Sequence, residues 1–305
     1  MSSQYILGID IGGTHIRMGA VDETFKVHFF EKTKSQPILD TEAPLDRLCS
    51  LITEFEEKHS IKLSAVSIGF PSTIDAPRRK VISTPNIASL QNLDVVDFIE
   101  NKLGLRTYIN RDVNYLLLSD LNNLELNPTP SSVCGFYIGT GIGNTIMINN
   151  RLLIGKNGKA AELGHTHVIG FDGQCGCGGK GCVELLSGGL ALARIQREYF
   201  KDTLIDDIFT MHADTEVIDK YIDDLAATVC NEIVIIDPEL CLFGGGVIQM
   251  ANFPKERFEK YIYKYARKPC EEGSISIVYV EDNPESGVQG AGIYAFKRIN
   301  DSSYL

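Results

Sequence analysis

The sequence contains no apolar segment long enough to cross a membrane. Of its 305 residues 44% are apolar, which is enough to bury a substantial core. No uninterrupted apolar stretch approaches the ~20 residues of a membrane span. Met1 to Gln4 lead directly into a short apolar run, without the basic and long apolar segments of a secretory signal. We therefore expect a cytoplasmic protein that makes no contact with a membrane.

Basic residues are scarce relative to acidic ones. Lys and Arg number 29 against 40 Asp and Glu, so the formal net charge is -11. A nucleic-acid-binding protein would be expected to carry a basic face. The cluster Arg78-Arg79-Lys80 is short and isolated, which is typical of a solvated loop. We expect no nucleic-acid partner, whereas an anionic nucleotide remains compatible because backbone amides and magnesium can hold its phosphates.

The cysteines do not have the spacing of a disulfide framework. Five of the eight are scattered, mostly through apolar segments, and are interpreted as reduced core residues: Cys49, Cys134, Cys230, Cys241 and Cys270. The other three lie within eight residues of one another. One tight cluster together with scattered single cysteines indicates metal binding in a reducing compartment.

The tight cluster has the composition of a structural zinc site. Its candidate ligands, within 18 residues, are His165, Cys175, Cys177 and Cys182. Three thiolates and one imidazole fill a tetrahedral shell and leave no open position, which a zinc hydrolase would need. We therefore predict a structural zinc ion, with a reduced loop that holds no metal as the alternative.

Short apolar strands and amphipathic helices alternate in two successive halves of the chain. In the first half, strands are predicted at 5–10, 17–21, 27–33, 65–70 and 107–110, and helices at 45–58, 95–103 and 113–121. In the second half, strands are predicted at 133–138, 144–148, 151–154, 240–243 and 274–280, and helices at 188–199, 217–235 and 290–299. Each half predicts a mixed sheet with helices on its faces.

A polar segment separates the two halves. Residues 122–132 include Pro128 and Pro130, and such a segment is a good candidate for a boundary. We predict an N-terminal lobe over 1–121 and a C-terminal lobe over 122–305. The terminal helix 290–299 is expected to pack back on the first lobe.

Three strand ends are rich in glycine and predict phosphate binding. Asp10 is followed by Gly12, Gly13 and Thr14; glycines let backbone amides approach phosphate oxygens, and a carboxylate suits magnesium. The others contribute Gly139, Thr140, Gly141, Gly143, Gly244, Gly245 and Gly246. Each could be an ordinary turn, but ligands gather at the carboxyl ends of strands in α/β sheets. No Walker sequence is present.

Three carboxylates lie where they could contact a substrate. Asp112 lies between a predicted strand and a predicted helix. It could cap that helix or act as a general base toward an attacking hydroxyl. Glu162 and Glu184 flank the cysteine loop. They could be ordinary surface carboxylates, or they could accept hydrogen bonds from sugar hydroxyls in a loop that zinc holds.

Taken together, these motifs resemble those of the ROK sugar kinases, in the actin/hexokinase superfamily. The resemblance covers nearly the whole chain and includes the three glycine motifs and the run from Glu162 through the cysteines to Glu184. It implies an α/β fold of two actin-like (ribonuclease H-like) lobes, each a mixed sheet flanked by helices, with an active-site cleft between them. ATP, Mg²⁺ and a structural Zn²⁺ are the implied cofactors.

The resemblance also implies roles for individual residues. Asp112 is the catalytic base that activates the 6-hydroxyl of a hexose, and the implied sugar-binding positions are Asn86, Arg111, Asp112, Glu162, His165 and Glu184. Many ROK glucokinases have Asn where this chain has Arg111. Because Arg offers only donors and more bulk, we expect a sugar other than glucose.

The neighbouring segments are most similar to those of the D-allose kinases of the family. These are Ser83-Thr-Pro-Asn86 and Arg111-Asp-Val-Asn114. Glucose, fructose and N-acetylmannosamine remain alternative substrates.

A function of a different class is a sugar-sensing transcriptional regulator, because the family includes such proteins. These need a DNA-binding segment, commonly an N-terminal helix-turn-helix. Only four residues precede the first predicted strand, and the chain is acidic, so we expect the kinase. By analogy with the family we also expect a homodimer.

Overall fold

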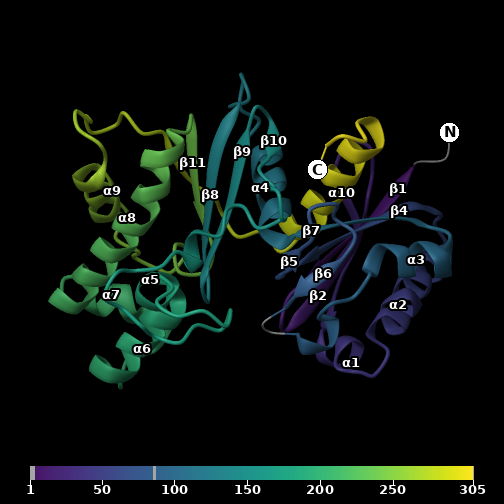
Figure 1. The fold of residues 1–305 in the computed structure, drawn as a ribbon, viewed down its shortest axis with the longest axis horizontal. Helices are drawn as coiled ribbons and strands as arrows, with labels where there is room; N and C mark the ends of the chain where they lie inside the picture. The colour runs from purple at the N-terminus through teal and green to yellow at the C-terminus, as the bar shows by residue number, and fades with distance from the viewer. Residues whose placement is uncertain (1–3, 85–86, 305) are drawn as a thin grey trace. The chain divides into compact units, whose positions relative to one another are not determined.

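The computed structural model describes residues 4–84 and 87–304, which form two compact units. Unit 1 comprises Met1–Thr129, Ile154–Ala160 and Asn283–Leu305, and unit 2 comprises Pro130–Leu153 and Ala161–Asp282. Each unit contains a five-stranded sheet with helices (Figure 1). The predicted mixed α/β fold is thereby confirmed. Unit 1 extends past the predicted boundary at residue 121, to Thr129, and also includes the segment Ile154–Ala160. The terminal helix, which was expected to pack on the first lobe, lies in unit 1.

The sheet of unit 1 has the order β3-β2-β1-β4-β7. Strand β1 pairs antiparallel with β2 and parallel with β4, and β4 pairs parallel with β7. Its strands are β1 (Tyr5–Ile11), β2 (His15–Val21), β3 (Val27–Lys34), β4 (Leu63–Phe70) and β7 (Arg106–Arg111), with a small hairpin of β5 (Thr73–Ile74) and β6 (Val81–Ser83). Its helices are α1 (Gln36–Leu39), α2 (Pro44–His59), α3 (Val95–Leu103), α4 (Asp112–Asn123) and α10 (Ser286–Asn300).

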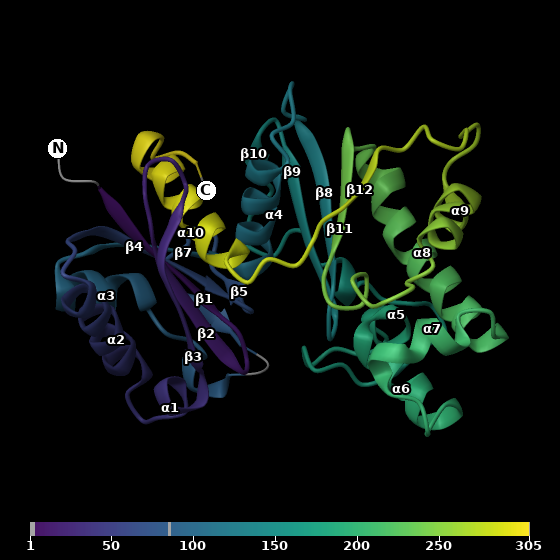
Figure 2. The same cartoon turned by 180° about the vertical axis from the view of Figure 1, so that it is seen from behind.

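Alternation along β1 decides which helices cover each face of this sheet. Leu7 and Ile9 are fully buried in a core that includes residues of α2 and α3. Gly8 faces the other way, and a Cβ there would overlap the carbonyl of Val288 in α10. Figure 2 shows α10 beside β1 and α4, although α10 is far from both of them in the sequence. The C-terminal helix therefore completes the unit that the N-terminal strands begin.

The sheet of unit 2 has the order β10-β9-β8-β11-β12, with β8 parallel to β11 and β11 parallel to β12. Its strands are β8 (Ser132–Ile138), β9 (Ile142–Ile148), β10 (Arg151–Leu152), β11 (Leu240–Gly244) and β12 (Ile277–Tyr279). Its helices are α5 (Glu184–Ser187), α6 (Gly189–Tyr199), α7 (Ile208–His212), α8 (Glu216–Ile236) and α9 (Lys255–Tyr265).

Aromatic packing links the central strands of unit 2 to a helix. The rings of Phe136 in β8 and Phe243 in β11 stack with centroids 5.0 Å apart. Phe258 of α9 meets Phe243 edge-on at 5.2 Å. All three side chains are fully buried, and offset-stacked and edge-on pairs are the favoured arrangements of aromatic rings.

Two expectations about local structure hold only in part. The late strand predicted at 274–280 is only Ile277–Tyr279. The solvated loop predicted for Arg78-Arg79-Lys80 holds for Arg79, whereas Arg78 is only 4% exposed. Its guanidinium Nη1 donates to the carbonyl oxygen of Ile74 at 3.0 Å, a contact that a count of sequence charges cannot reveal. Among the described residues, no helix is long and apolar enough to span a membrane.

A buried carboxyl group lies in the core of unit 2. Glu232 of α8 is 7% exposed, and its Oε1 accepts a hydrogen bond of 2.7 Å from Asn144 Nδ2 of β9. Burial raises the pKa of Glu232 to about 7, although the hydrogen bonds from Asn144 and Cys134 oppose this shift. At pH values between about 4.5 and 7, Glu232 is therefore protonated to a greater extent in the folded protein than in the unfolded chain.

This carboxyl group predicts a loss of stability toward alkaline pH. A raised folded-state pKa contributes stability that is complete below the unfolded pKa, near 4.5, and disappears as the pH rises through about 7. The contribution is at most about 3 kcal/mol. Urea unfolding at pH 5 and pH 8 should show this loss in the wild type and a smaller loss in Glu232→Gln. Glu256→Gln, at an exposed position of α9, is the matched control, and equal losses in all three proteins would contradict the assignment.

Candidate functional site

Parallel pairing brings the predicted residues of unit 1 to one edge of its sheet. In the register of β1, β4 and β7, Asp10 pairs with Gly69, and Gly69 pairs with Asn110. The strands are parallel, so their carboxyl ends lie at the same edge. Asp112 follows two residues beyond Asn110. The two carboxylates predicted to hold magnesium and to act as base thus leave the same edge of the same sheet.

Asp10 lies between the guanidinium group of Arg17 and helix α10. Its Oδ2 accepts from Nη1 of Arg17, its partner in the antiparallel register of β1 and β2, at 3.1 Å. A Cβ at Gly287 in α10 would lie 2.7 Å from Asp10 Cγ. Burial raises the pKa of Asp10, while Arg17 opposes the shift. A divalent cation at this carboxylate would favour its ionised form.

The first glycine turn is fixed by a residue that sequence reasoning missed. The N–H of Gly12 donates to the carbonyl oxygen of His15 at 2.8 Å, which closes the turn between β1 and β2. Ser35 holds the same turn: its hydroxyl donates to the carbonyl of Gly12 at 2.6 Å and its N–H to that of Thr14 at 3.0 Å. Gly13 lies within this turn. The only sign of this role in the sequence is that Ser35 follows a strand, and serines at strand ends are too common to indicate it.

Asn110 shapes the junction from which Arg111 and Asp112 project. It is fully buried, and its Oδ1 accepts from the N–H of Arg111 at 2.9 Å and from Nδ2 of Asn114 at 2.8 Å. Asp112 begins α4, and its Oδ1 accepts from the N–H of Val113 at 2.8 Å. The role of Asn110 was not predicted, since one buried asparagine at a strand end has many possible roles.

Arg111 is nearly buried and contacts a segment distant in sequence. It is 8% exposed, and its Nη1 donates to the carbonyl oxygen of Ala160 at 3.1 Å. Ala160 ends the segment Ile154–Ala160, which belongs to unit 1. Asn86, the other sugar-binding residue predicted in this unit, lies outside the described residues.

The second and third glycine motifs meet at the carboxyl ends of β8 and β11. The second motif, residues 139–143, turns the chain from β8 into β9, and the N–H of Gly189 at the start of α6 donates to the carbonyl of Gly139 at 2.9 Å. In the third motif, residues 244–246, Gly245 has a φ of +89° and lies so close to Ile138 that a Cβ would be 2.6 Å from its backbone nitrogen. These contacts explain why small residues are needed here.

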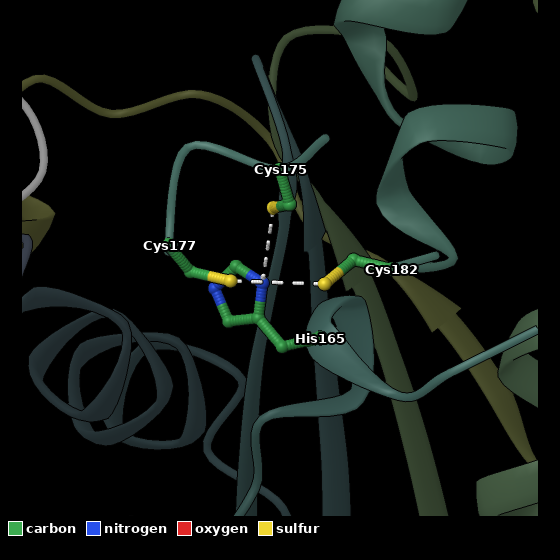
Figure 3. Close-up of side chains that lie close together, drawn as sticks. All are labelled: His165, Cys175, Cys177 and Cys182. Carbon is green, nitrogen blue, oxygen red and sulfur yellow. Dashed lines mark hydrogen bonds between the residues drawn. The ribbon is translucent and has the colours of Figure 1, made fainter. Parts of the chain in front are cut away.

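The four predicted zinc ligands converge in unit 2. The donor atoms of His165, Cys175, Cys177 and Cys182 all lie within 4.8 Å of one another. Figure 3 shows the three sulfurs and the imidazole ring directed toward one another. The Sγ atoms of Cys177 and Cys182 are 3.7 Å apart, and Cys175 Sγ lies 3.8 Å from His165 Nδ1.

These separations fit a tetrahedral zinc ion. Zn–S bonds of ~2.3 Å and Zn–N bonds of ~2.0–2.1 Å place the ligand atoms of a tetrahedron about 3.5–3.8 Å apart. The distances of 3.7 Å and 3.8 Å agree with that range. Three thiolates and one imidazole would complete the shell, so the residues present suit a structural ion with no open position for water.

Glu184 links the cysteine cluster to the second glycine motif. Its Oε1 lies 3.1 Å from Cys175 Sγ and 3.5 Å from His165 Nδ1. A Cβ at Gly141 would overlap Glu184 Oε2, so the carboxylate also contacts the glycine turn. Glu162 precedes the short 3₁₀ helix Leu163–His165, and its carbonyl accepts from the N–H of His165 at 3.0 Å.

The structure groups the predicted residues by unit. Unit 1 brings together Asp10, the turn 12–14, Arg111 and Asp112. Unit 2 brings together the two other glycine motifs, the cluster of predicted metal ligands, Glu162 and Glu184. One edge thus offers carboxylates and a glycine turn, and the other offers backbone amides, carboxylates and a rigid loop. Taken by itself, the edge of unit 1 suits the binding of magnesium and phosphate, and the edge of unit 2 suits the binding of phosphates and hydroxyl groups.

The contact between Gly141 and Glu184 predicts that a side chain at position 141 would move the Glu184 carboxylate. In Gly141→Ala the new methyl group would displace the carboxylate from Cys175. Because the carboxylate ends a flexible side chain, the free energy of unfolding should change by no more than about 1 kcal/mol. A crystal structure and a thermal unfolding curve measure both effects. Gly139→Ala is the matched control, since a Cβ there meets no atom within 4 Å, and a Glu184 that stays in place in Gly141→Ala would contradict the prediction.

Known proteins match the chain over most of its length. The chain is 28% identical over 287 residues to the N-acetyl-D-glucosamine kinase of Salmonella typhimurium, which covers 86% of this chain and 91% of that protein. The crystal structure of a ROK family glucokinase from Streptomyces griseus, in complex with glucose and AMPPNP, matches with a TM-score of 0.77 and 24% identity over 95% of this chain and 98% of that one. The ROK hexokinase of Thermus thermophilus matches with a TM-score of 0.82 and 22% identity over 98% and 100%.

A model of the ROK family matches residues 6–298. This range includes the described strand edges, the glycine motifs and the cysteine cluster. The relatives are named as sugar kinases, so the predicted enzyme class, a carbohydrate kinase, is confirmed at that coarse level. The chain belongs to the ROK family, as its sequence motifs predicted.

Proposed function

We propose that this protein transfers the γ-phosphoryl group of ATP to the 6-hydroxyl of a hexose, with D-allose as the preferred sugar and D-allose 6-phosphate as the product. The observation that carries the proposal is the register Asp10–Gly69–Asn110, which directs Asp10 and Asp112 from one sheet edge. Phosphoryl transfer needs both a metal-holding group and a group that orients the attacking hydroxyl.

Asp112 is proposed to act as the general base. Its carboxylate accepts the proton as the sugar oxygen attacks the γ-phosphorus, and the bond between that phosphorus and the ADP oxygen breaks. The N–H of Val113 bonds one carboxylate oxygen, which orients the group and leaves it able to accept from the sugar. Asp10 is proposed to bind hydrated Mg²⁺, which would neutralise charge on the phosphates. The amides of the glycine turns supply the remaining donors.

Arg111 is proposed to select the sugar. Its side chain is held by the carbonyl of Ala160, so a bulky donor occupies the position before the base. Allose and glucose differ in the orientation of one hydroxyl, and a donor at this position would favour a different hydroxyl pattern from the one that Asn favours. Asn86, Glu162, His165 and Glu184 are proposed to contact the other hydroxyls. Glucose, N-acetyl-D-glucosamine, fructose and N-acetylmannosamine are the alternatives to be measured.

Zinc is proposed to hold the loop that carries these groups. His165 would bind the ion through Nδ1, which faces the sulfurs, while Glu184 packs against Cys175. The ion would supply a rigid tetrahedral cross-link and no reactive water. A homodimer and a cytoplasmic location complete the proposal by analogy with the family.

The kinase proposal predicts the outcome of one set of assays. The rate of ADP release is measured with ATP, Mg²⁺ and a low concentration of each sugar: allose, glucose, fructose, mannose, N-acetyl-D-glucosamine and N-acetylmannosamine. Release should be fastest with D-allose. Asp112→Asn should lower kcat about 10³-fold, because loss of a general base typically costs 10²–10⁴-fold. Sugar binding measured by calorimetry should change little, since the hydrogen-bonding shape of the side chain is kept.

Calorimetry also serves as the control for folding of the variant. Turnover of Asp112→Asn close to that of the wild type would refute the assignment of the base. A clear preference for another sugar would retain the kinase and refute the role of Arg111 in selecting allose.

The zinc proposal predicts one zinc ion per chain in the purified protein. Cys177→Ser should lose most of the metal and unfold at a lower temperature, because a tetrahedral shell that lacks one thiolate binds zinc more weakly. Mass spectrometry of the native protein and thermal unfolding measure both effects. Cys270→Ser is the control, as Cys270 lies outside the cluster. Equal zinc content in Cys177→Ser and the wild type would contradict the ligand assignment.

A further inference from the structure

Unit 1 contains a cavity with an unusual number of arginines for so acidic a protein. Its volume is about 280 Å³, and it lies among the loop before β6, the start of β7 and the end of α10. Four of its lining residues are arginines, namely Arg78, Arg79, Arg106 and Arg298. Glu100 is the carboxylate that lines it. The cavity is formed by residues of unit 1 alone.

The carboxylate in the cavity is already engaged. Glu100 Oε2 accepts from Arg79 Nη2 at 3.0 Å, and its Oε1 accepts from the N–H of Thr107 at 3.1 Å. Arg79 also pairs with Asp97. Within the described parts of the chain, the three remaining arginines form no ion pair with a carboxylate. The cavity thus contains three arginines that are not paired with a carboxylate, of which Arg106 is exposed and Arg78 is buried.

Arg78 is the clearest case of an arginine without an anionic partner in this cavity. It is 4% exposed, and the contacts of its Nη1 are to neutral carbonyl oxygens, those of Ile74, Asp75 and Gly158. Its buried Nε has no partner among the described residues. Burial lowers the pKa of Arg78 to about 10. A buried guanidinium that lacks an anion is costly, so an anion at this position would stabilise the unit.

Arg298 is oriented toward the same cavity by two aromatic rings. Its guanidinium carbon lies 5.7 Å from the centre of the Tyr108 ring and 5.9 Å from that of Tyr294. Its Nη1 donates to the hydroxyl of Tyr294 at 3.3 Å, whereas its buried Nε has no partner within residues 4–84 and 87–304. Aromatic faces hold a guanidinium in place without neutralising it, so the group stays available to an anion.

We propose that this cavity is a binding site for a small phosphate-bearing anion, separate from the glycine motifs and strand edges described above. Planar guanidinium groups recognise phosphate oxygens through paired hydrogen bonds. The volume accommodates a phosphate group with a small organic part. The free positive charge of Arg78, Arg106 and Arg298, in a chain of net charge -11, favours an anion over a neutral ligand.

The cavity is connected to the segment that holds Arg111. Arg78 Nη1 lies 3.5 Å from the carbonyl oxygen of Gly158, and Arg111 Nη1 donates to that of Ala160. An anion at Arg78 would therefore act on the segment Ile154–Ala160, which Arg111 also contacts. Arg111 directly precedes Asp112 in the sequence. Binding of an anion in the cavity could thereby influence the sheet edge from which Asp112 projects. The binding of the anion itself can be measured without an assay of turnover.

Calorimetric titration with inorganic phosphate, pyrophosphate and glucose 6-phosphate, in magnesium-free low-salt buffer, tests the proposal. We expect saturable binding of at least one anion to the wild type, with affinity reduced at least tenfold in Arg106→Gln and in Arg298→Gln. Tighter binding of inorganic phosphate or pyrophosphate would identify a free phosphate as the ligand, and tighter binding of glucose 6-phosphate would identify a phosphate monoester. Arg47→Gln, at an arginine of α2 outside the cavity, should bind as the wild type does.

Further variants and outcomes keep the test decisive. Arg106 is exposed, so its replacement should leave the thermal unfolding midpoint unchanged. Arg298→Lys, which keeps the charge, should retain more affinity than Arg298→Gln. Binding that is unchanged in Arg106→Gln and Arg298→Gln would place the anion at the glycine motifs and overturn the proposal. Absence of binding to the wild type at about 10 mM of each anion would also overturn it. None of these readouts depends on the protein being a kinase.

Discussion

Parallel pairing of strands is the constraint on which the arrangement of the candidate site depends. In unit 1 the register aligns Asp10, Gly69 and Asn110 across β1, β4 and β7, and the segments that follow these strands must therefore leave from one edge. In unit 2 the pairing of β8 with β11 brings the two glycine motifs together in the same way. In unit 2, residues as distant in sequence as Ile138 and Gly245 become neighbours because their strands end together.

Close packing then fixes the groups that these edges present. Helix α10, from the end of the chain, approaches so closely that Gly8 and Gly287 have no room for a side chain, and this approach encloses Asp10. In unit 2 the Cys and His cluster holds Glu184 against Gly141. Interiors packed at this density respond to a single added methyl group, so the glycines contribute to the geometry as much as the carboxylates do.

Much of this was predictable from the sequence, and the rest was not, for identifiable reasons. The glycine motifs, the Cys and His cluster and most strands and helices follow from local spacing. Helix α3, for example, ends at Leu103 before Gly104, which has a φ of +63°. Ser35 was missed because its hydrogen bonds reach back to Gly12 and Thr14, whose proximity only the fold reveals. Asn110 was missed although its bonds to Arg111 and Asn114 are local, because an asparagine at a strand end has many possible roles. Arg78 was misjudged because burial of a charged side chain depends on tertiary packing, which residue type does not report.

The most direct test of the central claim is a crystal structure of the protein with a non-hydrolysable ATP analogue, Mg²⁺ and D-allose. The account predicts that the Asp112 carboxylate lies within hydrogen-bond distance of the 6-hydroxyl, with Mg²⁺ beside Asp10 and the phosphates against the glycine turns. A sugar bound away from Asp112, or a nucleotide that contacts none of the three glycine motifs, would contradict it.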